Sequence, residues 1–375
     1  MFVRKGAPDI LYLVKPAEVN EELKYSLRSL KNINHGRVFI AGYTPSWVEG
    51  TYESIPVRQD GEKYQNVRNN LLSALKDPRL SDDFILMNDD FFIMKPTKVM
   101  PVLRRLKDLD HYIELFEKVD ASSYYVNSMR QARDVLRDWG IKEEISSYEL
   151  HVPMMFNKVK LQALLDRLPH DYSIAHLRTL YGNYYNIGGE RIRDVKGIKD
   201  GQEIDYDGAF LSSIDESFET GEVGRYVRSK LAKVLIFSHA NDSDGVLSVL
   251  LAQLAFPYVD YLLTNNPQHD ILEYIKGKDV DAIYDYVFIT DIYPGRPVLE
   301  VLQNAYWFDH AEHSVDKIKE HGLVLPNARI AMDTNGRPAS ASQLFYTWLK
   351  ENTLLSANAD DIVEYVRRED TWDFE

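Results

Sequence analysis

One histidine and two aspartates directly follow a short apolar run in the second half of the chain. His239, Asp242 and Asp244 come after the expected strand 234–238 and before an apolar helix expected over 246–256. Imidazole nitrogens and carboxylate oxygens bind divalent cations, and two carboxylates at i and i+2 of a loop can face two different ions. This loop is therefore a candidate site for divalent metal ions.

The same arrangement occurs twice more downstream. Asp291 follows the expected strand 286–290, and Asp309 and His310 follow the apolar residues 305–308. Because parallel strands bring their carboxyl ends to one edge of a sheet, these side chains are expected to meet there. Three strands that are each followed by a residue able to bind a metal ion predict a site for two metal ions.

A second candidate site lies in the first half, within the segment SDDFILMNDDFFIM at 81–94. Its apolar run is too short for a typical helix and predicts a buried parallel strand that presents Asn88, Asp89 and Asp90. Two carboxylates among hydrophobic residues are costly to desolvate unless a cation or hydrogen-bond donors compensate them. A divalent metal carrying a diphosphate would do so. The alternative is an ordinary turn, because Asn and Asp favour turns.

Short apolar runs and amphipathic stretches alternate along the first hundred residues, which predicts a doubly wound α/β sheet. Ligands of such sheets bind at the carboxyl ends of the strands, where the polar residues at 88–90 are expected. The expected strands are 9–15, 37–41 and 81–94, the expected helices are 18–30 and 65–75, a loop is expected over 42–50, and helical structure is expected over 103–136.

The chain has 375 residues and a net charge of −14. A chain of this length usually forms two domains, and a change of character near residue 230 predicts the domains 1–230 and 231–375. The acidic balance argues against a surface that coats a polyanion. Because there is no cysteine, disulfides, thiolate metal sites and cysteine nucleophiles are excluded.

No apolar run is long enough to span a bilayer, and residues 1–8 lack the apolar core of a signal peptide. We therefore expect no membrane span and a cytoplasmic location.

Five segments of the first half follow a pattern known from a transferase family. They are ELKYSLRSL at 22–30, Pro-Ser-Trp at 45–47, KYQNVRNNLLSAL at 63–75, SDDFILMNDDFF at 81–92 and His-Val-Pro at 151–153. Together they resemble the Stealth-type transferases and related GT-A-like glycosyltransferases of phages and bacteria. The Tyr-Thr-Trp-Val opening of true Stealth proteins is absent, which leaves open whether a sugar or a sugar-phosphate is transferred.

This resemblance implies that Asp89 and Asp90 hold Mg²⁺ or Mn²⁺ against the diphosphate of a nucleotide-sugar donor. It also implies that His151 acts as a base or as a partner of a phosphate. A lone histidine before a proline is equally read as a loop residue whose hydrogen bonds are satisfied. Arg28 and Lys63 are candidates for pairing with phosphates, or they are solvated helix charges. The residues expected to act in catalysis are Asp90 and His151, and those expected to bind the donor are Arg28, Lys63 and Asn88.

Four segments of the second half resemble the amino-terminal domain of DHH phosphoesterases, in the nanoRNase and oligoribonuclease branch. They are SHANDSDGVLSVLLAQLAF at 238–256, TDIYP at 290–294, DHAEH at 309–313 and EDTWDF at 369–374. The resemblance implies a parallel α/β domain that hydrolyses a phosphodiester or pyrophosphate, with Asp291 bridging two Mn²⁺ ions. The metal ligands that it implies are His239, Asp242, Asp244, Asp291, His310 and Asp370.

The second half departs from this family in three ways. One extra residue stands between His239 and Asp242, and Ala311 replaces the second histidine of the DHH motif. The group that usually touches the scissile phosphate is thus missing unless His313 replaces it, and His313 and Asp309 are the expected catalytic residues. The sequence also stops where these enzymes continue into a smaller substrate-gripping domain, which makes activity on nucleic acids doubtful.

The combined expectation is a bifunctional protein, a nucleotide-sugar-dependent transferase fused to a metal-dependent phosphoesterase. Its acceptor would be modified phage DNA, a nucleotide or a glycan, and its location the host cytoplasm if a phage encodes it. One alternative is chiefly a Mn²⁺-dependent phosphodiesterase on short oligonucleotides or cyclic nucleotides, with a first domain that only recognises ligands. A third reading treats both domains as binding modules without activity, because of Ala311 and the absent substrate-gripping domain.

Overall fold

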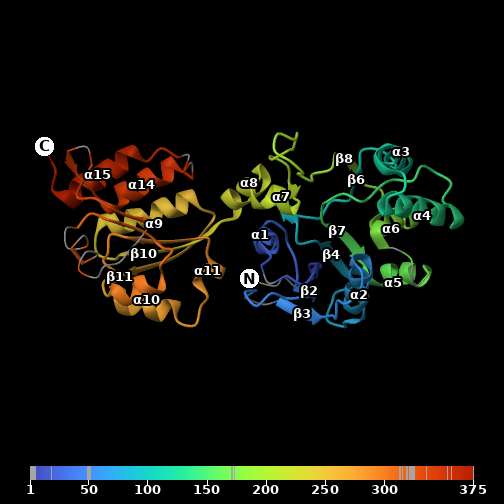
Figure 1. Ribbon diagram of the computed structural model, residues 1–375, viewed down its shortest axis with the longest axis horizontal. Coiled ribbons are helices and arrows are strands. Elements are labelled where there is room, and N and C mark those ends of the chain that lie inside the picture. Colours follow the sequence, from blue (N-terminus) through green and yellow to red (C-terminus); the bar gives the residue numbers. More distant parts are fainter. Residues whose placement is uncertain are drawn as a thin grey trace. The chain divides into compact units, whose positions relative to one another are not determined.

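The structure is a computed structural model, and the chain is mixed α/β with parallel strands (Figure 1). It divides into two compact units, Met1–Tyr226 and Val227–Glu375. Among the described residues, no helix is both long and apolar enough to cross a membrane. The described residues are 6–17, 19–48, 52–169, 172, 174–311, 314, 316–317, 320, 326–334, 336–352, 354–355 and 357–374.

The main sheet of the first unit has the strand order β3-β2-β1-β4-β7. The first four strands run parallel and β7 is antiparallel to β4. The chain passes from β1 to β2 on one side and places β4 on the other side, so the strand order reverses between β1 and β4, which is where open α/β sheets bind ligands. The strands are β1 (Asp9–Val14), β2 (Val38–Gly42), β3 (Tyr52–Pro56), β4 (Asp83–Met87) and β7 (Met154–Asn157).

One sequence-based expectation for this sheet was wrong, and one strand was missed. No element was predicted over β3, an edge strand in which Ile55 is the one buried residue. The expected strand 81–94 is two strands in different sheets, because the chain turns at 88–90 and Phe91 N–H donates back to the Asn88 carbonyl. The second strand, β5 (Phe91–Ile93), pairs antiparallel with β9 (Phe210–Ser212).

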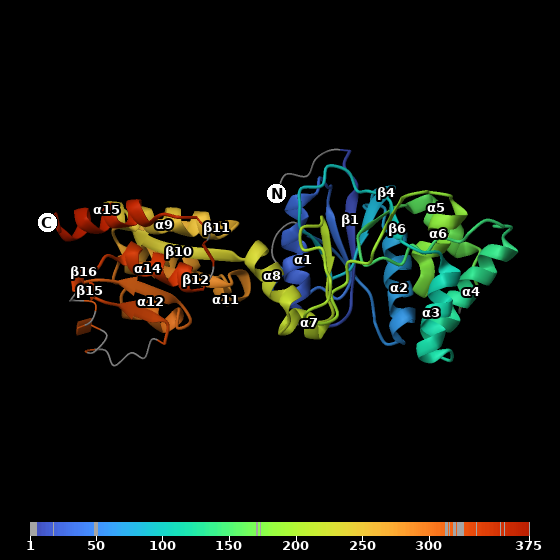
Figure 2. The same cartoon turned by 90° about the horizontal axis from the view of Figure 1, so that it is seen from above.

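The helices of the first unit bury apolar residues on both faces of the main sheet. Helix α1 begins where Asn20 accepts a hydrogen bond from Leu23 N–H, and it buries Leu23 and Leu27 against one face. Figure 2 shows α3 and α4 side by side. The helices are α1 (Glu21–Ser29), α2 (Lys63–Lys76), α3 (Leu109–Asp120), α4 (Tyr124–Asp138), α5 (Lys158–Asp166), α6 (Leu177–Tyr184) and α7 (Asp215–Glu219), with 3₁₀ turns η1 (Leu30–Asn32) and η2 (Ile174–His176); β6 (Leu103–Arg105) pairs with β8 (Glu190–Ile192).

The buried carboxylate of Asp9 ties together the beginnings of three strands of this sheet. It accepts hydrogen bonds from Arg37 N–H at 2.7 Å and from Ser81 N–H at 2.9 Å, and it pairs with the Arg37 guanidinium. Removing it leaves two partly buried N–H groups and the Arg37 guanidinium without their acceptor, so we expect Asp9→Ala to lower the free energy of unfolding by about 3 kcal/mol. Urea denaturation would measure the loss, with the exposed Asp82→Asn substitution as the matched control. An unchanged midpoint would contradict this role.

The sheet of the second unit is entirely parallel, with the order β11-β10-β12-β13-β14. Strand β10 is buried on both faces, as expected for a parallel sheet covered by helices on each side. The strands are β10 (Lys233–His239), β11 (Tyr258–Thr264), β12 (Tyr286–Thr290), β13 (Tyr306–Asp309) and β14 (Ala328–Ile330), and β15 (Asp333–Thr334) pairs with β16 (Arg337–Pro338).

Helices α9, α14 and α15 cover one face of this sheet, and α10 and α12 cover the other (Figure 1). Ile236 packs toward the first group and Phe237 toward the second, so successive residues of β10 serve opposite cores. The helices are α8 (Glu222–Leu231), α9 (Ser243–Ala255), α10 (Pro267–Ile275), α11 (Val280–Ile283), α12 (Arg296–Val301), α14 (Ala341–Glu351) and α15 (Asp360–Thr371).

Candidate functional site

The sheet of the second unit brings its predicted metal ligands to one edge. His239 ends β10, Asp291 follows β12 and His310 follows β13, and these three strands are neighbours in the sheet. Asp370 comes from α15. Asp291 has a left-handed backbone with φ of 58°, which is uncommon for a residue other than glycine and turns the chain sharply where the strand ends.

The turn after β10 depends on a cap and a glycine. Asp242 accepts a hydrogen bond from Gly245 N–H at 2.9 Å and so begins α9. A Cβ atom at position 245 would lie 2.3 Å from the His239 carbonyl oxygen, so this position requires glycine. The close approach places the start of α9 against the end of β10.

Asp291 lies between the two histidines of this cluster. His239 Nδ1 lies 3.9 Å from Asp291 Oδ2 and also contacts Asp242 Oδ2. His310 Nε2 lies 3.4 Å from Asp291 Oδ1 and 3.2 Å from Asp370 Oδ2. The Asp291 carboxylate therefore lies next to both neighbouring groups of candidate ligands.

The donor set fits divalent cations. Oδ2 of Asp291 and Oδ2 of Asp370 are buried and, among the described residues, have no hydrogen-bond partner. One histidine nitrogen lies 3.9 Å from Asp291 Oδ2 and another lies 3.2 Å from Asp370 Oδ2, but neither oxygen accepts a hydrogen bond from these residues, so a cation would compensate their burial. The groups whose ligand atoms all lie within 4.8 Å of one another are His239, Asp242 and Asp291; Asp244, His310 and Asp370; and Asp291, Asp309 and His310.

The cluster is electrostatically unbalanced without a cation. Burial and the neighbouring carboxylates of Asp244 and Asp242 raise the pKa of Asp291, although His310 opposes this. Burial raises the pKa of Asp370 to about 6, with Asp244 adding to the effect. The pKa of His310 is raised because the attraction of Asp291 and Asp370 outweighs its burial.

Asp244 has a second role that the sequence did not predict. It is completely buried and accepts hydrogen bonds from Ala341 N–H at 2.8 Å, from Ser342 N–H at 3.1 Å and from the Ser342 hydroxyl. These groups form the N-terminus of α14, which favours a negative charge. The N-terminus of α14 therefore fixes the position of the Asp244 carboxylate beside the cluster.

Asp309 was expected to take part in catalysis, but its carboxylate is engaged in the turn that follows β13. Oδ1 accepts hydrogen bonds from His310 N–H at 2.7 Å and Ala311 N–H at 3.2 Å, and Oδ2 accepts one from the Ser314 hydroxyl at 2.6 Å. Although it also belongs to one metal-compatible group, these contacts give it a structural role. His313, the other expected catalytic residue of this unit, lies outside the described residues.

We expect Asp309→Ala to destabilise the protein by about 2 kcal/mol, because three donors lose their buried acceptor. Asp309→Asn keeps one oxygen and should cost less than half of this. Thermal unfolding of both variants without metal would measure the difference. A melting temperature for Asp309→Ala equal to that of the wild type would rule out the structural role.

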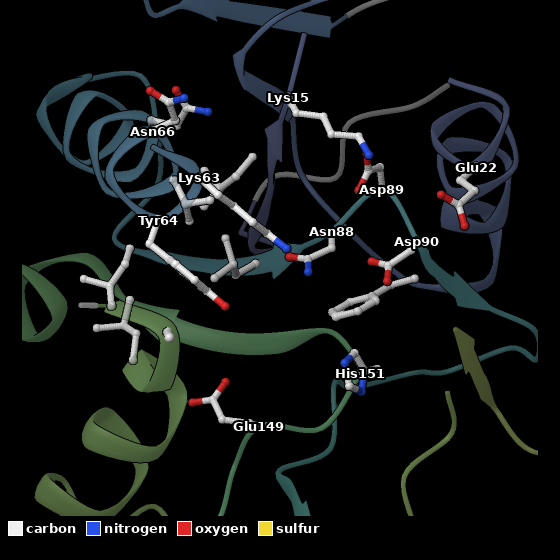
Figure 3. Close-up of a pocket in the computed structure, with 18 of the residues that line it drawn as sticks. Lys15, Glu22, Lys63, Tyr64, Asn66, Asn88, Asp89, Asp90, Glu149 and His151 are labelled. Atoms are coloured by element: carbon white, nitrogen blue, oxygen red, sulfur yellow. The ribbon is translucent and has the colours of Figure 1, made fainter. Parts of the chain in front are cut away.

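In the first unit, a cavity of about 880 Å³ lies at the carboxyl ends of β1 and β4. Asn88, Asp89 and Asp90 line it together with Lys63 and His151. Figure 3 shows the end of Lys63 extending toward Asn88. The sequence-predicted residues of this half therefore meet around one cavity, with one exception.

The exception is Arg28, which is not among the residues that line the cavity. Its guanidinium carbon lies 4.9 Å from the ring centroid of Tyr25 on the same helix. A role of Arg28 in binding donor phosphate at this cavity is therefore not supported. The pairing that the sequence suggested for Lys63 remains possible in geometry, because Lys63 lines the cavity.

The two aspartates are held differently. Asp89 Oδ2 accepts a hydrogen bond from Asn20 Nδ2 at 2.9 Å, and burial raises the pKa of Asp89. Asp90 Oδ2 lies 3.3 Å from both Lys196 Nζ and Ser212 Oγ. Neither aspartate belongs to a three-residue metal-compatible group within the described parts of the chain, because those groups lie in the second unit.

Besides Lys196, four further charged residues of this cavity were not predicted from the sequence. Lys15 follows β1, and Figure 3 shows it directed toward Asp89. Glu22 of α1 accepts a hydrogen bond from Ser213 Oγ at 2.6 Å, and burial raises its pKa to about 7. The others are Glu149 and Arg178, for which no local motif gave a signal; burial raises the pKa of Glu149 and lowers that of Arg178.

Comparison with known proteins assigns the chain neither to a family nor to a function. No protein-family model and no curated protein matches it. Among solved structures, an uncharacterized protein from Helicobacter pylori G27 matches with 16% sequence identity and a TM-score of 0.30. The match covers 38% of this chain and 45% of that one, so this chain spans less than half the length of that structure. At this TM-score the likeness assigns neither a family nor a function.

Proposed function

We propose that the second unit is a divalent-metal-dependent phosphoesterase of the DHH type. The observation that carries this proposal is the position of Asp291 between His239 and His310, with a buried oxygen that accepts no hydrogen bond from the described residues. This arrangement supplies nitrogen and oxygen ligands for two neighbouring cations from three adjacent strands.

Each residue of the cluster has a distinct task in this proposal. Bound cations would supply a Lewis acid and a more acidic water molecule. His239 and Asp242 would hold one cation, Asp244, His310 and Asp370 would hold the other, and Asp291 would contribute to both. The substrate class is a phosphodiester or a pyrophosphate, whose negative charge the histidine and aspartate cluster alone would repel.

Hydrolysis assays with added metal test this function. The probes are bis(p-nitrophenyl) phosphate, a dinucleotide and a cyclic dinucleotide, each with Mn²⁺, with Mg²⁺ and with EDTA. We expect hydrolysis that requires the metal. If no probe is cleaved while Mn²⁺ still raises the melting temperature, the site binds metal without this activity.

We propose that the first unit is a GT-A-like transferase that uses a nucleotide-sugar donor. The supporting observation is the cavity at the reversal of strand order, where Asn88, Asp89 and Asp90 face Lys15 and Lys63. Lysines and carboxylates that line the same cavity suit a donor diphosphate held together with a divalent cation. In this proposal His151 accepts the proton of the acceptor.

A panel of nucleotide-sugars tests the transferase function. The full chain is incubated with each donor and Mn²⁺, and mass spectrometry follows donor loss and nucleoside phosphate release. Turnover of one donor would support the proposal and name its sugar. If no donor turns over while phosphodiester hydrolysis is present, the protein is chiefly a phosphodiesterase and the first unit is a recognition module.

A further inference from the structure

His151 is held by a residue 43 positions away in the sequence. Its ring Nδ1 lies 2.8 Å from Asp194 Oδ2, and its backbone N–H donates to Asp194 Oδ1 at 3.1 Å. Val195 N–H donates to the same Oδ1 at 3.0 Å. Two backbone donors therefore fix the orientation of the Asp194 carboxylate, so that Oδ2 faces the imidazole.

Arg105 holds the same carboxylate from the other side. Its NH2 group donates to Asp194 Oδ2 at 2.8 Å, and its Nε donates to the Glu149 carbonyl at 2.9 Å. The Arg105 side chain is 8% exposed, so the ion pair is largely sheltered from water. Although burial opposes ionisation, the hydrogen bond from His151 and the charge of Arg105 hold the pKa of Asp194 at about 2. Asp194 is thus a permanent acceptor.

We propose that Asp194 and Arg105 are positioning residues that fix His151 with its proton on Nδ1 and leave Nε2 as a proton acceptor at the cavity. The chemistry of this proposal rests on the transferase function proposed above. A carboxylate that orients an imidazole and selects its tautomer is a recurring device for making a histidine a general base. The part of the cavity near His151, away from Asp89 and Asp90, would then bind an acceptor with a hydroxyl group.

The proposed transfer involves the acceptor hydroxyl, the donor and the imidazole of His151. The O–H bond of the acceptor breaks and its proton passes to His151 Nε2, while the acceptor oxygen bonds to the electrophilic centre of the donor. The bond from that centre to the leaving nucleoside phosphate breaks, and its electron pair departs with the phosphate oxygen. The resulting imidazolium is stabilised by Asp194 and later releases its proton to solvent.

The tautomer itself is measurable without any substrate. Long-range ¹H–¹⁵N correlation spectra of the full chain, labelled with ¹⁵N-histidine, distinguish the two tautomers, and His151→Gln assigns the resonance. We expect the Nδ1–H form of His151 in the wild type. Finding the Nε2–H form would overturn the proposal, whatever the protein catalyses.

Asp194→Asn should invert this tautomer. Because two backbone N–H groups require an oxygen at Oδ1, we expect the new amide NH₂ to take the place of Oδ2, where it faces His151 Nδ1 and also deprives the Arg105 guanidinium of its acceptor. It would donate to Nδ1 and move the ring proton to Nε2, which abolishes the base. The matched control is Asp207→Asn, since the Asp207 side chain is 96% exposed.

If a donor is turned over, kcat for transfer should fall by about a hundredfold or more in Asp194→Asn, with the donor KM unchanged. Equal kcat values in variant and wild type would overturn the proposal. If the wild type turns over no donor, the transferase function fails, and the tautomer of wild-type His151 still decides the positioning role. That spectrum also decides it if Asp194→Asn does not fold.

Discussion

Asp291→Asn is expected to reduce metal-dependent phosphodiester hydrolysis by more than about a hundredfold, because loss even of an outer-shell partner costs ten- to a hundredfold in metal sites. Asp291 contributes to both sides of the proposed site, and an amide cannot replace a shared carboxylate. Asparagine tolerates the left-handed backbone at this position, so the fold should persist. Initial rates over a range of Mn²⁺ concentrations would measure the effect.

The same variant should be more stable than the wild type when metal is absent. The pKa of Asp291 is raised in the folded chain above its value in the unfolded chain, chiefly by burial, so ionisation at neutral pH opposes folding. Stability of the metal-free wild type should therefore decrease as pH rises above the ordinary carboxyl range near about 4, and this decrease should be smaller in Asp291→Asn. Thermal unfolding at several pH values with EDTA would measure it.

Mn²⁺ should reverse the order of stability. A ligand that binds only the folded state stabilises it by an amount that grows with the logarithm of its concentration divided by Kd, so the wild type should gain more than the variant. The control is Asp361→Asn, which changes an exposed carboxylate on the helix that carries Asp370. Equal stabilisation of Asp291→Asn and Asp361→Asn by Mn²⁺ would exclude Asp291 as a ligand.

The metal-compatible cluster was accessible from the sequence because most of its residues follow strands directly. His239, Asp291 and His310 each stand within a residue or two of an apolar run, and a parallel sheet brings such ends together. Asp370 has no such local signal, and only the resemblance to a known motif pointed to it. The role of Asp244 as an acceptor for α14 depends on a contact 97 residues away, which no local pattern contains.

The first unit shows where sequence patterns fail. Apolar residues on both sides of 88–90 suggested one long strand, whereas the turn divides them between two sheets. The partner of His151 was not predicted, because Asp194 lies in a segment without a motif and reaches His151 only through the tertiary fold. Glu22 lies in the expected helix 18–30 and was not singled out there, yet it lines the cavity.

Asp90→Asn is expected to abolish turnover of the nucleotide-sugar donor, with a loss of at least about a hundredfold, while leaving phosphodiester hydrolysis unchanged. The carboxylate lies 3.3 Å from Lys196 Nζ and faces the cavity, so its charge can be used by a cation bound with the donor diphosphate. Asp89→Asn should act in the same direction and weaken binding of Mn²⁺ with the donor.

The control for these variants is Asp82→Asn, an exposed position just before β4 and at the opposite end of that strand from the cavity. Mass spectrometry of released nucleoside phosphate would be run on all three variants beside the hydrolysis assay. Loss of donor turnover in Asp89→Asn and Asp90→Asn alone would tie the reaction to these two carboxylates. If Asp89→Asn and Asp90→Asn still consume the donor while Asp291→Asn does not, the second unit hydrolyses the donor pyrophosphate and the cavity serves only for binding.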